Sequence, residues 1–259
     1  DKPMSQIELR NVSLSRDNNI VLQNIDLAIP GGEWTSIVGP NGAGKSTLVQ
    51  ALAGLLPYQG SIQIAGIELN SIAIKARAQQ IAWLEQATVT PDNLDFGLRA
   101  YDIAMLGRLP HQNWLSIPST QDHLVVKQAM RQTAAWDLRE RFFSQLSGGE
   151  RQRILLARLF ATQATVLLMD EPIANLDPPL QADWLQWQIT LSSQGKTSIT
   201  VLHEIQFALR ADNLILLGNK GVHHQGKSDD PLTHQALIDL FDGRIELTKL
   251  GNRWAALAR

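Results

Sequence analysis

The chain has 259 residues, a length that can bury a complete hydrophobic core within one large domain. Its formal net charge is −2, so no overall positive field exists to hold nucleic acid or an anionic membrane by charge alone. The sequence contains no cysteine, which excludes a disulfide framework and a thiolate metal site and suits a reducing compartment.

The sequence offers no segment that could span a bilayer. The most apolar stretch, residues 154–169, is interrupted by Arg158 and Gln163 and falls short of the roughly 20 apolar residues that a spanning helix needs. The first residues show no secretory signal, and the fold prediction starts at Met4, after Asp1-Lys2-Pro3. Any association with a membrane is therefore expected to be mediated by another protein.

The first elements along the chain are predicted to be short strands. Apolar residues alternate with polar ones on both sides of a polar turn at residues 16–19, which indicates an antiparallel sheet. A later strand leads through a glycine-rich stretch into a helix with apolar positions Leu48, Leu52 and Leu55. The strands predicted in this half are residues 7–9, 21–27, 34–38, 61–64 and 81–84.

The sequence pattern changes after the predicted strand at 81–84. Proline-punctuated loops surround helical positions from residue 87 to about 145, which predicts a helical insertion. Its helical positions are Val125, Ala129, Ala134 and Leu138. Continuous apolar runs of strand length follow at residues 166–169, 198–202 and 214–217, as expected for parallel strands covered on both faces. Strands alternating with helices predict an α/β core whose ligands lie beyond the carboxyl ends of its strands.

A phosphate-binding motif lies between the predicted strand at 34–38 and the helix after it. It fits G-x-x-x-x-G-K-[ST] and comprises Gly39, Pro40, Asn41, Gly42, Ala43, Gly44, Lys45, Ser46 and Thr47. Backbone N–H groups of such a loop converge on phosphate oxygens, Lys45 can reach the β and γ phosphates, and Ser46 can ligate Mg²⁺. The motif predicts an ATP and Mg²⁺ site. The competing interpretation, a glycine-rich turn with a surface lysine, is disfavoured by the strand–loop–helix context.

Two adjacent carboxylates, Asp170 and Glu171, follow the apolar strand at 166–169. Beside a P-loop, a strand-end aspartate can hold Mg²⁺ directly or through water, and a neighbouring glutamate can polarise the attacking water. We therefore assign Asp170 to the metal and Glu171 to catalysis, whereas in isolation such a pair is usually a solvated turn. His203 follows the strand at 198–202 and could hydrogen-bond the γ phosphate or the water, although a lone histidine there is more often structural.

Residues Leu146-Ser147-Gly148-Gly149-Glu150 resemble the signature motif of ABC ATPases, which a generic P-loop enzyme does not need. From the residues alone this segment is a helix start, because Ser147 with Glu150 three residues later forms a capping box. The two interpretations are compatible, since a capped helix N-terminus preceded by paired glycines suits an anion. The resemblance implies that Ser147, Gly148 and Gly149 face the γ phosphate held by a second copy of the chain.

The resemblance to ABC ATPases covers nearly the whole chain and keeps the family's motif order. It implies a P-loop NTPase (RecA-like) core with an antiparallel β subdomain and an inserted helical subdomain. The expected single domain divides into core residues 1–86 and 154–218, a helical subdomain at 87–153 and a C-terminal segment at 219–259.

Three further motifs are similar to those of the family. Gln86 resembles the Q-loop glutamine, which implies contact with Mg²⁺ or the water and coupling to the transport subunit. Residues 174–177 resemble the D-loop, which implies communication across a dimer. His203 matches the switch histidine, and Glu204 stands where the family more often has aspartate.

One position departs from the family. An aromatic residue on which adenine stacks usually precedes the strand that carries Val21 and Leu22, but the alignment places Arg16 there. Its guanidinium plane could stack on the base instead. If no stacking occurs, the preference for the adenine base is expected to be relaxed.

The motif at residues 106–111, followed by Asp122, resembles the helical region of importers for iron-siderophore, haem and cobalamin, as does the tail at 237–241. Read alone, His111 is a surface or helix-packing residue, and a haem-ligand role for it or for His223 or His224 has no support beyond residue type.

The competing class is a soluble ABC ATPase that acts in DNA repair, on chromosomes or on ribosomes. Such proteins carry long coiled-coil insertions or two cassettes, whereas this chain has one copy of each motif and no heptad run. A lone P-loop kinase does not account for residues 146–150. An importer for another metal or nutrient stays open.

The expected function is ATP hydrolysis by a homodimer that closes on ATP and Mg²⁺ and drives a membrane permease. A substrate-binding protein is expected as an indirect partner, and nucleic acid is not expected as a partner. The expected location is the cytoplasmic face of the inner membrane, peripheral through the permease.

Overall fold

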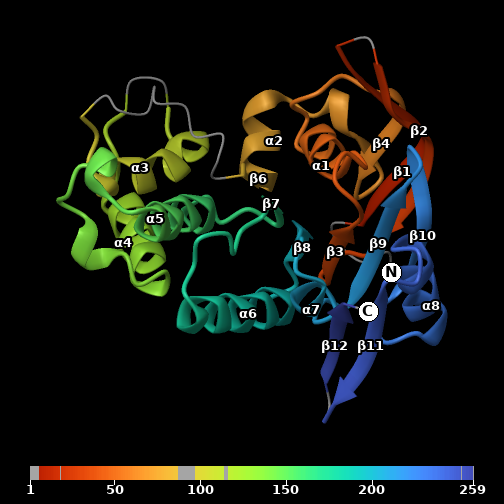
Figure 1. Cartoon of the computed structure of the whole chain (residues 1–259). Helices are drawn as coiled ribbons and strands as arrows, with labels where there is room; N and C mark the ends of the chain where they lie inside the picture. Colours follow the sequence, from red (N-terminus) through yellow and green to blue (C-terminus); the bar gives the residue numbers. More distant parts are fainter. Residues whose placement is uncertain (1–5, 18, 87–96, 114–115, 252, 259) are drawn as a thin grey trace. The chain divides into compact units, whose positions relative to one another are not determined.

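The computed structural model describes residues 6–17, 19–86, 97–113, 116–251 and 253–258 (Figure 1). The chain divides into two compact units, which are described separately. Unit 1 comprises Asp1–Ile72 and Leu185–Arg259, and unit 2 comprises Ala73–Trp184. Among the described residues, no helix has the length and apolar character needed to cross a membrane. The subdomain boundaries expected at residues 87 and 153 stay a prediction.

Unit 1 contains the antiparallel sheet expected near the N-terminus, in the order β2-β1-β4-β5. Its strands are β1 Ile7–Arg16, β2 Asn19–Ile29, β4 Gln59–Ile64 and β5 Ile67–Glu68. Ile7 in β1 pairs with Ile29 on one side and Ile64 on the other. Ile7 and Leu9 are buried, and after a register shift Val12 and Leu14 are buried as well, so one face of this sheet covers the core.

Unit 1 also contains the strands that position the phosphate loop. They are β3 Trp34–Val38, β8 Thr197–Val201, β9 Asn213–Gly218 and β10 Gly221–Lys227. β3 pairs in parallel with β8 and β9, and β10 adds to β9 in the antiparallel sense. Every residue of β8 is buried, which confirms the prediction of a covered parallel strand at residues 198–202, and β3 is buried throughout as well.

The other elements of unit 1 are α1 Lys45–Leu52, η1 Leu69–Ser71, α7 Ile205–Ala208, α8 Pro231–Leu240, β11 Ile245–Leu250 and β12 Arg253–Ala258. β11 and β12 form a C-terminal hairpin. The ring of Trp254 in β12 lies 4.4 Å from that of His234 in α8, so the hairpin is packed onto the unit.

Unit 2 is mainly helical. Its elements are α2 Ile74–Gln80, β6 Ile81–Leu84, α3 Ala100–Met105, η4 Leu106–His111, α4 Thr120–Gln132, η5 Trp136–Leu138, η6 Phe143–Gln145, α5 Gly148–Ala161 and β7 Val166–Asp170. The helix α6 Pro178–Ser193 begins in unit 2 and ends in unit 1. β6 and β7 pair in parallel, and α5 packs against α3, α4 and β6. The predicted helical insertion is thus confirmed for its described residues, and residues 87–96 lie outside them.

A buried ion pair fixes α4 and η4 relative to α5. Arg108 Nε lies 2.8 Å from Asp122 Oδ1, and its Nη1 donates to the carbonyl of Ala161 at 2.8 Å. The hydrogen bond from Arg108 lowers the pKa of Asp122 to about 2. A Cβ on Gly107 would lie 2.2 Å from the carbonyl oxygen of Arg158, so only glycine lets η4 approach α5 this closely. The motif at residues 106–111 therefore has a packing role.

Two helix predictions were too long. Leu55 lies outside α1, because the chain leaves the helix at Gly54, whose φ of 71° favours glycine, and the Leu55 side chain is exposed. Ala134 lies outside α4, since its φ of 51° breaks the helical path, and Leu138 belongs to the short η5. The sequence did not reveal α2, which has no buried residue and hence no apolar stripe.

Candidate functional site

The predicted phosphate-binding motif forms the turn between β3 and α1. Gly39 follows β3 directly, and a Cβ there would lie 2.3 Å from the carbonyl oxygen of Leu217, so no larger residue fits. Gly44 precedes α1 with φ 90°, and its carbonyl accepts the N–H of Leu48 at 2.9 Å. The loop therefore presents the positive N-terminal end of α1 at the carboxyl end of β3.

Lys45 lies inside this loop. Its ammonium donates to the carbonyl of Gly39 at 2.8 Å and to that of Pro40 at 3.0 Å, and the residue is only 6% exposed. Ser46, the next residue, is partly exposed, and Thr47 is buried. A cation and a hydroxyl thus stand side by side in the first turn of α1, the arrangement that a triphosphate with a metal ion requires.

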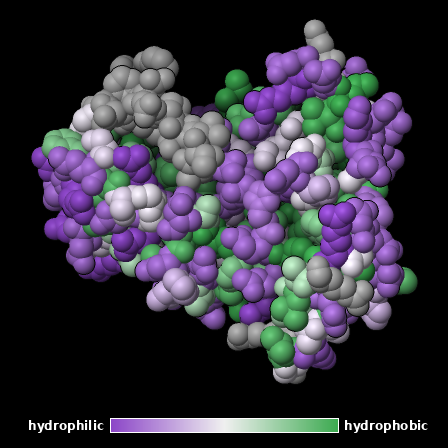
Figure 2. Space-filling model, in the orientation of Figure 1, coloured by the Kyte–Doolittle hydropathy of each residue, from purple (hydrophilic) through white to green (hydrophobic). Residues whose placement is uncertain are grey.

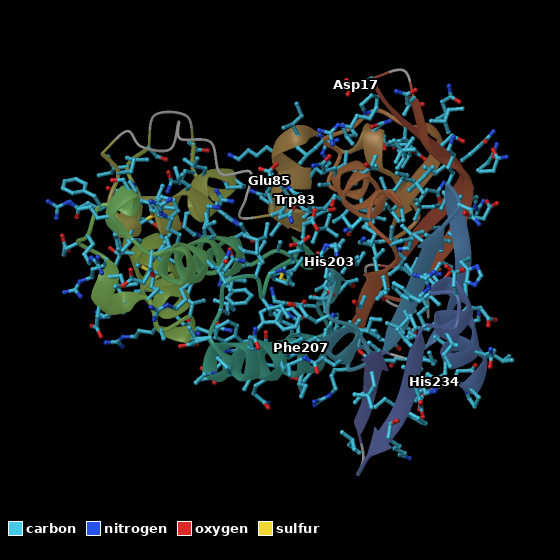
Figure 3. The ribbon with its side chains drawn as sticks, viewed as in Figure 1. Asp17, Trp83, Glu85, His203, Phe207 and His234 are labelled. Atoms are coloured by element: carbon cyan, nitrogen blue, oxygen red, sulfur yellow. The ribbon has the colours of Figure 1, made fainter. Side chains whose placement is uncertain are left out.

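His203 emerges at the same edge of the sheet as the phosphate loop. Ile37 of β3 pairs with Val201 of β8, and the N–H of Leu202 donates to the carbonyl of Ile37 at 3.4 Å. Because the two strands are parallel, His203 and Gly39 both follow carboxyl ends that meet at this edge. The imidazole is exposed, so it is accessible to a ligand at the loop. Figure 3 labels His203 where the chain leaves β8.

Arg16 is the exposed last residue of β1, where it pairs with Asn19 of β2. The hairpin that carries it packs on the phosphate loop. A Cβ added at Gly44 would lie 2.9 Å from Cγ1 of Val21 and 2.9 Å from Cγ of Leu22, both in β2. The structure therefore brings the strand next to Arg16 against the loop, while a contact of Arg16 with a base stays a prediction.

In unit 2, the predicted carboxylates and Gln86 leave one strand pair at the same edge. Leu84 of β6 pairs with Met169 of β7 in parallel, so Gln86 and Asp170 follow adjacent strand ends. Asp170 is 2% exposed. Glu171 adopts φ 50°, a left-handed conformation that costs a non-glycine residue about 1 kcal/mol or more and that recurs at functional sites.

The signature residues form the predicted capping box at the start of α5. The hydroxyl of Ser147 accepts the N–H of Glu150 at 3.3 Å, and the N–H of Ser147 donates to Oε2 of Glu150 at 2.8 Å. That backbone hydrogen bond is the main reason that the pKa of Glu150 lies below its usual value. A Cβ on Gly149 would lie 2.8 Å from the carbonyl of Asn175, so the predicted D-loop packs against this turn.

One residue that joins α5 to the segment after Glu171 was not identified from the sequence. Gln152 in α5 is fully buried, and its Nε2 donates to the carbonyl of Pro172 at 2.8 Å. The helix is therefore tied to the chain segment that directly follows Glu171. The signal was available, since Gln152 lies three and four residues before Leu155 and Leu156, on the apolar side of the helix.

The described residues contain no group of three or more His, Asp or Glu side chains that could hold a metal ion by themselves. Mg²⁺ bound with a nucleotide does not need such a group, because phosphates and water supply most of its oxygen ligands. The Ser46 hydroxyl in the first turn of α1 and the Asp170 carboxylate at the end of β7 are oxygen donors of the required kind. Each of these oxygen donors therefore suits Mg²⁺ by its chemistry, and a single ion held by both stays a prediction.

Two of the three histidines that were weighed as haem ligands, His111 and His224, take part in local hydrogen bonds. His111 Nε2 lies 2.8 Å from the carbonyl oxygen of Thr162, and His224 Nε2 lies 2.9 Å from Oγ1 of Thr233. Both contacts join neighbouring elements, which agrees with a packing role for His111.

Comparison with known proteins places this architecture in a family. The sequence profile described as ABC transporter matches residues 22–174. An achromobactin transport ATP-binding protein of Dickeya dadantii is 35% identical over 242 residues, which cover 92% of this chain and 88% of that protein. A hemin import ATP-binding protein of Pseudomonas putida is 34% identical over 242 residues, covering 91% and 92%.

Solved structures share the fold. A transporter described as of the metal-chelate ABC type, in an inward-facing conformation, gives a TM-score of 0.78 at 27% identity and covers 97% of this chain and 96% of its own. A dimeric ATP-binding cassette in a post-hydrolysis state with ADP and Pi gives 0.75 at 26% identity, covering 86% and 99%. This chain belongs to the ABC transporter family, as one of its ATP-binding and ATP-hydrolysing subunits.

Proposed function

We propose that the chain powers a membrane importer whose cargo is an iron-siderophore complex, haem or cobalamin. One observation carries this proposal: nearly the whole chain is similar to ATP-binding subunits whose names state such a cargo. The achromobactin transport protein is 35% identical to this chain, and the hemin import protein is 34% identical. A manganese transport ATP-binding protein of Synechocystis is 32% identical over 92% of the chain, which makes a simple metal ion the second candidate cargo.

Residues 39–47 bind the triphosphate of ATP. The glycine-rich turn and the N-terminal end of α1 supply backbone N–H groups and positive potential, and Lys45 reaches the β and γ phosphates. Ser46 and Asp170, with Gln86, would hold Mg²⁺. Bound there, the ion would neutralise charge that builds up on the phosphates.

Glu171 polarises the attacking water, and His203 hydrogen-bonds the γ phosphate. The strained backbone of Glu171 supports the first role, because such conformations persist where the surroundings hold a side chain in a set direction. The exposed position of His203 at the edge of the phosphate loop supports the second. Lys45 stabilises the charge that spreads over the γ phosphate during the transfer.

Ser147, Gly148 and Gly149 close over the nucleotide held by a second copy of the chain. The capping box supports this role, because it aligns a helix N-terminus as an anion site while satisfying its first N–H groups only in part. A dimer of a structurally similar cassette with ADP and Pi supports the homodimer. Hydrolysis therefore requires two chains.

The chain acts at the cytoplasmic face of the cell membrane, where a permease receives the conformational change and a substrate-binding protein delivers cargo to that permease. The helical region and the Gln86 segment contact the permease. ATP occupancy then biases the conformation of the permease, because the closed and open dimers bind it differently.

The deciding experiment reconstitutes the chain with its permease in vesicles and measures ATP hydrolysis with each cargo. A rise in hydrolysis with one ferric siderophore, haem or cobalamin is expected. Stimulation by Mn²⁺ alone would select the second candidate, and copurification with ribosomes or DNA instead of a permease would refute the importer.

A mixed dimer tests the shared site. Lys45→Ala and Ser147→Arg each inactivate both sites of a homodimer, but a dimer that combines the two variants retains one intact site. Recovery of part of the hydrolysis on mixing is expected, and no recovery would contradict a site built from two chains.

A further inference from the structure

Three cations surround one aromatic ring on the helical unit. The ring of Trp136 in η5 lies 5.4 Å from Lys127 Nζ, 5.9 Å from Arg131 Cζ and 4.7 Å from Arg139 Cζ. Tyr101 packs edge-on against the same ring, with centroids 6.4 Å apart. We call Trp136, Lys127, Arg131 and Arg139 the basic cluster.

The cluster has more positive charge than its neighbours offset. Arg139 lies 3.8 Å from Glu140, but that carboxylate also pairs with Arg99. None of the ion pairs within the described part of the chain includes Lys127 or Arg131. Three like charges around one ring repel one another, and the ring face offsets only part of that repulsion. The cluster should therefore attract an anion.

The helical region carries a positive charge although the whole chain is slightly negative. Residues 97–153 contain eight lysines and arginines against five carboxylates, although the whole chain has a net charge of −2. One pair, Arg108 with Asp122, is buried and contributes no field of its own. The excess of basic side chains is therefore presented at the surface of this region, where in Figure 2 hydrophilic residues predominate.

One exposed apolar side chain, that of Leu124, lies on the same helix face as the cluster, and Ile117 is exposed in the segment before α4. On α4, Leu124, Lys127 and Arg131 follow one another at helical spacing and share a face, opposite the buried Val126 and Met130. Leu124 is 56% exposed, and Ile117, just before α4, is 87% exposed. Basic and aromatic side chains with an exposed aliphatic side chain on the same face, here Leu124, are the combination found where proteins lie on lipid headgroups.

We propose that this face of α4 and η5 binds an anionic bilayer surface, with phosphate headgroups at the basic cluster and Leu124 among the lipids. The proposal rests on the proposed function only in that a permease brings the chain to a membrane. A planar array of headgroups fits better than an acidic peptide, because the exposed Leu124 side chain beside the charges needs an apolar layer beyond them.

Sedimentation of the purified chain with vesicles tests this. Binding to phosphatidylcholine vesicles that contain phosphatidylglycerol is expected, with little binding to pure phosphatidylcholine and a loss of binding at high salt. Lys127→Gln and Arg131→Gln should each lower the partition coefficient about fivefold, and the double variant about 25-fold. Leu124→Ser should lower it by the same factor at each salt concentration at which the unaltered chain still binds.

Lys220→Gln, an exposed cation on unit 1, is the matched control and should bind as the unaltered chain does. Equal binding by the Lys127 and Arg131 double variant, or equal binding to both kinds of vesicle, would overturn the proposal. So would binding to polyglutamate without binding to vesicles, since that outcome selects an acidic protein partner. Cargo-stimulated hydrolysis in the reconstituted complex is read out separately, so failure of one proposal leaves the other measurable.

Discussion

Replacement of Asp122 by asparagine should destabilise the chain in a way that depends on pH. Asp122 is 6% exposed and pairs with Arg108, and that hydrogen bond lowers its pKa from 3.8 to about 2. A depressed pKa means that the carboxylate stabilises the folded state fully above pH 4 and progressively less as the pH falls towards 2. A difference of about 1.8 pKa units means that the ionised Asp122 adds about 2.5 kcal/mol to the free energy of unfolding at neutral pH and about 1.3 kcal/mol at pH 3.

Asparagine has the shape of a protonated aspartate, so it removes this contribution at every pH. Urea unfolding of the unaltered chain and of Asp122→Asn should therefore differ by about 2.5 kcal/mol or more at pH 7, because Arg108 also loses its counter-charge, and by about half as much at pH 3. Asp183→Asn, on the exposed face of α6, is the control. The same difference at both pH values would refute the electrostatic origin and leave only a packing defect.

Four further substitutions test the candidate site. Glu171→Gln should lower turnover about 10²- to 10⁴-fold with ATP binding retained, and turnover at the normal rate would remove the general-base assignment. Lys45→Ala should weaken ATP binding about 10- to 100-fold in equilibrium titrations, since a charged hydrogen-bond donor is lost. Arg16→Ala should reduce the preference for ATP over GTP, and unchanged affinities would exclude stacking on the base. Gln152→Met should lower the unfolding free energy by about 1–3 kcal/mol, because the carbonyl of Pro172 loses its buried donor.

The sequence predicted the fold well where patterns were strong. The strands β3, β7, β8 and β9 are short apolar runs in an alternating α/β order, and the capping box marked the start of α5. It failed where burial is weak, since α2 has no apolar stripe. It also failed where the backbone conformation of one residue ends a helix. Ala134 has a left-handed φ, and an alanine in the sequence does not indicate such a conformation.

The sequence alone predicts which residues are candidates for the site, but it does not predict the contacts that hold them. The positions of Gly39 to Thr47, Asp170 and Ser147 follow from motifs with fixed spacing. The close approach of Gly39 to Leu217, and of Gly149 to Asn175, depends on which elements pack together, which no local pattern specifies. The basic cluster escaped notice for the same reason, because Trp136 meets Lys127 only after α4 ends.

The contacts of α5 suggest how events at its tip could reach the predicted catalytic base. The helix begins at the signature residues, its Gly149 packs against the carbonyl of Asn175, and its Gln152 holds the carbonyl of Pro172, one residue after Glu171. A movement of the helix tip on a nucleotide would therefore pull on the turn that keeps Glu171 in its left-handed conformation. Because that conformation is already strained, a small displacement should suffice to redirect the carboxylate, so hydrolysis would depend on closure of the dimer rather than on ATP binding alone.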